Sequence, residues 1–126
     1  MKDNLQEARR YLNNAKEMLS EKARKDGKFY QDKKYVKLAG HAAYSGVLIA
    51  LDELLGNKGK GRKSIDWYKA ELAKVDKKAL TSLNAVYDTL HLAMSYDGNS
   101  LVDISKAGLE LADSLINWVE NRHAAA

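Results

Sequence analysis

The stretch LAGHAAYSGVLIAL, residues 38–51, decides the fold. It is rich in Ala, Gly and Ser, and such small side chains allow a neighbouring helix to approach closely. Gly40 and Gly46 each lower helix propensity by about 1 kcal/mol, so their presence inside a helix indicates a packing role. An apolar series extends the stretch in both directions, from the candidate N-cap Asp32 to Gly56. We therefore predict a central, buried helix between these two residues.

Apolar side chains also recur every three or four residues along the rest of the chain. This spacing is typical of α-helices with one buried side, and the short connections favour antiparallel neighbours. Gly27 is expected to end the first helix, while Ser64 and Asp76 are expected to cap the third and fourth helices. The predicted helices cover residues 3–25, 32–56, 65–74 and 77–96, with a last helix from residue 99 or 100. No strand-like alternation appears, so we predict an all-α fold, a four-helix antiparallel bundle with one additional short helix.

Length and composition exclude several classes of protein. The chain has 126 residues with no Cys and no Pro, which fits one domain over residues 1–123, with the alanines 124–126 interpreted as a vector-derived tail. Without cysteine, disulfides, thiolate metal sites and cysteine nucleophiles are excluded. No apolar run reaches about 18 residues, and the first residues lack the apolar middle of a signal peptide. The expected location is the cytoplasm, with no membrane partner.

Positive charge is concentrated in the first half of the chain. Residues 1–63 carry 15 Lys or Arg against 8 Asp or Glu, whereas residues 64–126 carry 6 against 9. Such a basic half attracts anionic partners, although an exposed helix surface produces the same imbalance. Both interpretations remain open at this stage.

The loop GNKGKGRKS, residues 56–64, resembles a phosphate-binding P-loop only in part. Arg62 stands where that motif has an invariant Lys, and the loop follows a helix instead of a strand, so a nucleoside triphosphate site is not expected. The alternatives are a solvated loop and a weaker anion site for phosphate or an RNA backbone, built on the start of the next helix. The residues of this predicted anion site are Lys58, Lys60, Arg62, Lys63 and Ser64.

Two histidines lie inside predicted helices. Asp88 and His91 are three residues apart, so their side chains can meet across one helical turn. A structural hydrogen bond is the favoured interpretation and metal binding the alternative. Metal sites in helical bundles need two Glu-x-x-His motifs with further glutamates, and this single Asp-x-x-His has no such partner. We therefore predict no metal and no cofactor.

The second histidine belongs to a stripe on the central helix. Lys37 and His41 share this stripe with the larger apolar residues Tyr44 and Leu48. The stripe is either an interface, in a homodimer or with a protein partner, or a face that packs partly against the first helix.

The order of these pieces resembles the HEPN group of small bacterial helical domains. The resemblance rests on YLNNAKEML (residues 11–19), HAAYSGVLIALDELLG (41–56), the basic loop after it, and LHLAMSYDG (90–98) before a capped last helix. Membership would imply one of two activities. Many HEPN domains are metal-independent ribonucleases that use an Arg and a His four to six residues apart, and others are binding partners in nucleotidyltransferase systems.

This chain departs from the ribonuclease pattern at the decisive positions. His91 stands where the Arg is expected and Tyr96 where the His is expected, so the fixed cation for the phosphate is missing. The resemblance thus implies a non-catalytic protein that acts by association. The alternatives are a degenerate ribonuclease with His91, Tyr96 and Asp88 at its site, and a structural or antitoxin-like bundle without nucleic-acid contact.

Overall fold

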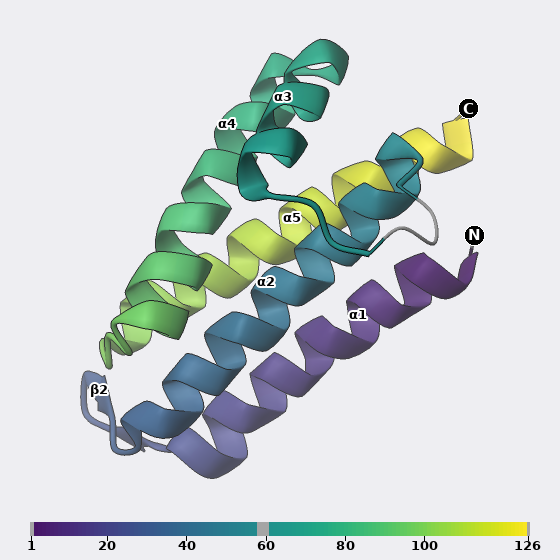
Figure 1. Cartoon of the computed structure of the whole chain (residues 1–126). Coiled ribbons are helices and arrows are strands. Elements are labelled where there is room, and N and C mark those ends of the chain that lie inside the picture. The colour runs from purple at the N-terminus through teal and green to yellow at the C-terminus, as the bar shows by residue number, and fades with distance from the viewer. Residues whose placement is uncertain (1, 58–60, 126) are drawn as a thin grey trace.

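A computed structural model describes residues 2–57 and 61–125, which form four long helices, one short helix and a small hairpin (Figure 1). The helix η1 continues α1, and η2 continues α4. Both are π-helical, with wider turns than an α-helix. The elements are α1 (Lys2–Glu17), η1 (Met18–Ala23), β1 (Lys25–Asp26), β2 (Phe29–Tyr30), α2 (Lys33–Leu55), α3 (Ile65–Val75), α4 (Lys77–Val86), η2 (Tyr87–Tyr96) and α5 (Val102–Ala125). The all-α prediction is broadly confirmed.

The hairpin corrects the expectation that the chain has no strands. The first helix ends at Ala23, and Gly27 lies in the hairpin turn with φ of 65°. β1 and β2 pair antiparallel, with Lys25 opposite Tyr30. Two-residue strands are too short to produce a recognisable alternation, which explains why the sequence pattern missed them.

The helix α2 lies at the centre of the molecule, as its small residues predicted. A Cβ atom on Gly46 would lie 2.8 Å from the carbonyl oxygen of Ala8 in α1. A Cβ atom on Gly40 would lie 2.7 Å from the carbonyl oxygen of Leu90 in η2. Both glycines therefore allow a neighbouring backbone to approach α2, and the packing role predicted for them is confirmed.

The apolar character of α2 also meets a membrane-span criterion. Lys33–Leu55 is long and apolar enough to cross a bilayer, and 67% of its most apolar window is buried inside the bundle. Core helices of globular proteins meet the same criterion, so we interpret this helix as part of the core.

The last helix begins later than expected, and it extends into the predicted tail. Val102 is its first residue, and the preceding turn is held by Asn99, whose Oδ1 accepts a hydrogen bond from the Leu101 N–H at 3.0 Å. The helix continues to Ala125, so part of the predicted tail is helical. The start of α1 and the end of α5 lie at one end of the molecule, and the hairpin lies at the other (Figure 1).

Candidate functional site

An aromatic cluster brings together residues from α2 and η2. The His91 ring lies against Tyr44, with ring centroids 4.8 Å apart, and against Tyr87 at 5.0 Å. Its Nδ1 is buried and has no hydrogen-bond partner among the described residues. The predicted hydrogen bond to Asp88 is therefore not formed. His91 acts here as a packed ring, while Tyr96 is 76% exposed.

Positive charge acts on this cluster. Lys69 of α3 places its Nζ 4.7 Å from the centroid of the Tyr87 ring, within range of a cation–π interaction. Burial raises the pKa of Tyr44 to about 12, against the opposing influence of the positive charge of Arg62.

A buried polar cluster anchors both ends of the glycine-rich loop. Asn57 donates from Nδ2 to Asp52 Oδ1 and to the Gly61 carbonyl oxygen, both at 2.9 Å. The Tyr68 hydroxyl donates to the same Asp52 oxygen at 2.5 Å. Burial and this hydrogen bond raise the pKa of Tyr68 to about 12. The loop is therefore tied to the bundle on either side of its central residues.

The predicted anion site is only partly described. Lys58 and Lys60 lie outside the described residues, whereas Arg62 and Lys63 are exposed. Ser64 caps α3 as predicted, because its Oγ accepts a hydrogen bond from the Trp67 N–H at 3.2 Å. One N–H group at the start of this helix is thus already satisfied by the chain itself.

The predicted interface stripe divides into two parts. Lys37 and His41 are exposed, whereas Tyr44 and Leu48 are only 6% and 2% exposed. The two larger side chains pack inside the molecule, so only the polar part of the stripe lies on the surface.

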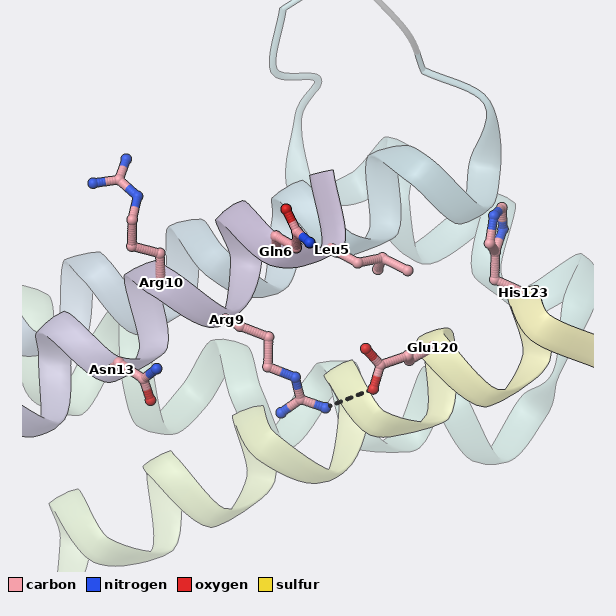
Figure 2. Close-up of a pocket in the computed structure, with 7 residues that line it drawn as sticks. All are labelled: Leu5, Gln6, Arg9, Arg10, Asn13, Glu120 and His123. Carbon is pink, nitrogen blue, oxygen red and sulfur yellow. Dashed lines mark hydrogen bonds and ion pairs between the residues drawn. The ribbon is translucent and has the colours of Figure 1, made fainter. Parts of the chain in front are cut away.

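A groove between α1 and α5 was not predicted. It encloses about 660 Å³, a volume typical of ligand sites, and Figure 2 shows side chains of both helices around it. Its lining residues are Leu5, Gln6, Arg9, Arg10, Asn13, Glu120 and His123. The adjacent Arg9 and Arg10 were the only signal in the sequence, and it gave no indication that α5 would lie opposite them.

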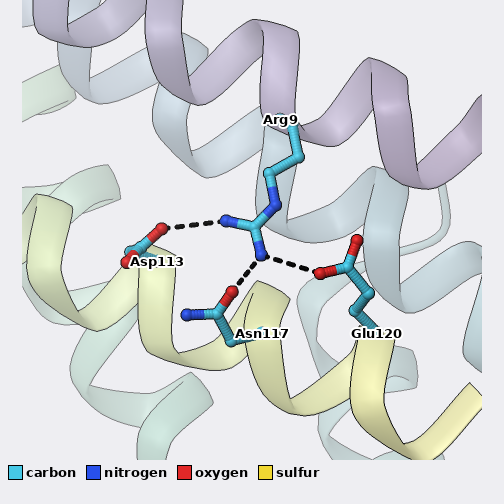
Figure 3. Close-up of polar contacts among 4 residues, drawn as sticks. All are labelled: Arg9, Asp113, Asn117 and Glu120. Carbon is cyan, nitrogen blue, oxygen red and sulfur yellow. Dashed lines mark hydrogen bonds and ion pairs between the residues drawn. The ribbon is translucent and has the colours of Figure 1, made fainter. Parts of the chain in front are cut away.

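Arg9 connects the two helices below this groove. Its guanidinium donates to Asp113 at 2.9 Å, to Glu120 at 3.1 Å and to Asn117, all of which lie on α5 (Figure 3). Its neighbour Arg10 points outward and pairs with Glu7 at 2.5 Å. Of the two arginines, Arg10 is therefore the one exposed at the surface, where it pairs with a residue of its own helix.

A second, smaller hollow lies further along the same side of the chain. It encloses about 290 Å³ at the junction where α1 continues into η1. Two exposed glutamates and one lysine line it. Its lining residues are Asn14, Glu17, Met18, Glu21 and Lys22. Within the described part of the chain, no group of three His, Asp or Glu side chains is placed to hold a metal ion.

Comparison with known proteins gives a family and a fold without an activity. Residues 3–121 match a family described as a domain of unknown function, DUF5618. A solved structure of a protein of unknown function from Dyadobacter fermentans is 50% identical, covers 96% of each chain and superposes with a TM-score of 0.88. No curated protein matches the chain.

Proposed function

The chain belongs to the DUF5618 family of domains of unknown function, and we propose that it is a non-catalytic helical bundle that acts by association, first of all with a second copy of itself. The observation that carries this proposal is the division of charge between Arg10 and Glu17 on the outer side of α1, where Arg10 also pairs with Glu7 of its own helix. Arg10 borders the larger groove, and Glu17 borders the smaller hollow. Both side chains are exposed and, seven residues apart, lie on the same side of the helix.

This division makes the surface complementary to itself. Two copies of α1 that pair antiparallel, about a two-fold axis near Asn13 and Asn14, place Arg10 of each copy opposite Glu17 of the other. A two-fold interface uses the same patch on both subunits, and opposite charges at its two ends fix the register. The exposed part of the α2 stripe does not suit this role, because neither Lys37 nor His41 brings a carboxylate that could pair with the lysine of a second copy.

A charge-swap series tests the dimer. Arg10→Glu alone and Glu17→Arg alone are each expected to weaken self-association about tenfold or more in sedimentation velocity, because each places like charges opposite each other. The double variant restores the opposite pairing and is expected to recover the dimer. Lys77→Glu, at an exposed position on α4, is the control for altered net charge. A wild-type protein that stays monomeric at high concentration, or a double variant that fails to recover, would contradict the proposal.

The packed ring of His91 supports a non-catalytic function. A ribonuclease needs a group that exchanges protons with the RNA, and here the imidazole packs against two tyrosine rings and its Nδ1 is buried without a hydrogen-bond partner among the described residues. We expect no cleavage of labelled single-stranded RNA that depends on this residue. Cleavage by the wild type that disappears in His91→Ala would instead favour the degenerate ribonuclease.

The proposal includes a HEPN-like origin for the bundle. It is supported by the order of the elements: a first helix, a central helix rich in small residues, a loop, a helix that ends in a turn at Gly98, and a last helix. Gly98 has φ of 63°, which suits the end of η2. A profile comparison between the DUF5618 and HEPN families tests this relationship.

A further inference from the structure

The end of the molecule that carries the hairpin has a high density of positive charge. Residues 22–37 contain seven Lys or Arg against two Asp, and all seven cationic side chains are exposed. One of the two carboxylates, that of Asp32, accepts a hydrogen bond from the Lys34 N–H at 3.1 Å and caps α2. Asp26 is thus the one carboxylate of this segment without such a structural role.

The fold gathers these charges around one turn. The Tyr30 N–H donates to the Ser100 carbonyl oxygen at 2.8 Å, and the Val102 N–H donates to the Lys28 carbonyl oxygen at 2.9 Å, so the hairpin is tied to the segment before α5. On the other side of that segment, a Cβ atom on Gly98 would lie 2.8 Å from carbon atoms of the Lys33 and Lys37 side chains. The hairpin, the start of α2 and the end of η2 therefore form one surface, which we call the basic end.

Two large aromatic rings stand exposed within the basic end. Phe29 in β2 is 51% exposed, and Tyr96, two residues before Gly98, is 76% exposed. Most large apolar rings of a folded domain are buried, so two on one cationic surface point to a ligand with both charge and flat apolar faces. Single-stranded nucleic acid has this combination, since its phosphates pair with Lys and its bases stack on aromatic rings.

We propose that the basic end binds single-stranded nucleic acid, with Lys25, Lys28, Lys33 and Lys37 on the phosphates and Phe29 and Tyr96 as stacking positions. An anionic membrane would also attract the lysines. Peripheral membrane binding, however, favours a continuous apolar face, and here the two rings lie on separate elements, β2 and η2. This inference goes beyond the proposed self-association and uses none of the residues assigned to it.

Fluorescence anisotropy with a labelled oligouridine of about 16 nucleotides, titrated at several salt concentrations, tests the proposal. Lys25→Ala with Lys28→Ala is expected to weaken binding about tenfold and to reduce the salt slope by about 1.4, because each lost phosphate contact reduces it by about 0.7. Phe29→Ser is expected to weaken binding about tenfold with the salt slope unchanged, since stacking releases no counterions. Circular dichroism confirms that each variant is folded.

Two control variants each remove two positive charges at other places on the surface. Lys77→Ala with Lys78→Ala on α4, and Arg62→Ala with Lys63→Ala in the loop, are expected to change the affinity less than threefold. An equal loss in the α4 pair would show attraction by net charge alone, and a larger loss in the loop pair would place the site there. Either result overturns the proposal.

Two further outcomes are decisive. Tighter binding to phosphatidylserine vesicles than to RNA, with the same dependence on Lys25 and Lys28, would assign the surface to a membrane and overturn the proposal. The dimer variant Arg10→Glu is expected to retain nucleic-acid affinity per protomer within about threefold. A failure of the self-association proposal therefore does not contradict nucleic-acid binding, and a failure of nucleic-acid binding does not contradict self-association.

Discussion

At the scale of single residues, Gly40 shows most clearly how the sequence determines packing. A Cβ atom there would lie 2.6 Å from the Met94 Cβ and 2.8 Å from the Ser95 backbone nitrogen, in addition to the contact with the Leu90 oxygen described above. Backbone atoms cannot rotate away as a flexible side chain can. The position therefore accepts only glycine while α2 and η2 keep their spacing.

The first prediction concerns this contact. Gly40→Ala should lower the free energy of unfolding by about 2 kcal/mol, because overpacking a tight core exceeds the gain in helix propensity. Gly56→Ala is the control, since Gly56 has φ of 73° with no atom within 4 Å of the added Cβ, and it should cost about 1 kcal/mol. Urea unfolding measures both. An equal loss in the two variants would show that the close approach of α2 and η2 has little energetic effect.

The second prediction concerns two of the buried tyrosines. Tyr44 and Tyr68 have pKa values of about 12 in the folded protein, whereas an unfolded tyrosine ionises near 10. Above pH 10 the unfolded chain therefore loses these protons first, so stability should be complete below pH 10 and fall as the pH rises towards 12.

Ultraviolet titration of the folded protein should show Tyr44 and Tyr68 ionising late, and burial raises the pKa of Tyr30 as well. The double variant Tyr44→Phe with Tyr68→Phe should lose less stability between pH 10 and 12 than the wild type. Ionisation of all seven tyrosines together near pH 10, without unfolding, would contradict the assignment.

Sequence spacing predicted which residues share one face of a helix, but it did not predict which residues of other helices they contact. It placed His91 beside Asp88, but the ring packs against Tyr87 of its own helix and against Tyr44 of α2, which lies 47 residues earlier in the chain. It also left Tyr44 and Leu48 either at an interface or packed partly against the first helix, because it could not show that α2 would be covered on that side. Contacts between distant elements depend on packing, which local periodicity does not encode.

At the scale of elements, Asp76 separates α3 from α4 with a single residue. Its backbone is extended, with φ of −164°, and its Oδ1 accepts hydrogen bonds from the Lys78 N–H at 2.8 Å and the Ala79 N–H at 3.4 Å. One side chain thus stops one helix from continuing into the next and satisfies the first N–H groups of the second.

The third prediction follows from this cap. Asp76→Ala should destabilise the protein by about 1 kcal/mol, and Asp76→Asn should retain most of the stability, because both Asp and Asn accept hydrogen bonds at an N-cap. Thermal unfolding followed by circular dichroism measures the difference. Equal melting temperatures for the alanine and asparagine variants would show that the side-chain hydrogen bonds at position 76 do not stabilise this helix boundary.

Element boundaries were predictable where a side chain marks them. Asp32, Ser64 and Asp76 each cap the helix expected of them. The π-helical turns of η1 and η2 have no comparable marker, since their residues follow the same apolar spacing as an α-helix. They depend on contacts with the rest of the bundle, and the sequence offered no signal for them.

At the scale of the whole molecule, the sequence predicted the number and order of the helices. It did not predict the groove or the basic end. The groove of Figure 2 forms because α1 and α5, at opposite ends of the chain, lie side by side and are joined by Arg9. The basic end likewise combines the hairpin, α2 and the turn after η2. Each surface needs segments that only the folded molecule brings together.

The placement of the two proposed surfaces determines how the protein should be tethered in a binding measurement. The groove includes Leu5 and His123, near the start of α1 and the end of α5, whereas the basic end lies at the opposite pole (Figure 1). Anchoring either terminus to a sensor chip would crowd the groove and leave the lysines and exposed rings of the basic end open to solution. Immobilised protein should therefore capture oligonucleotide undiminished.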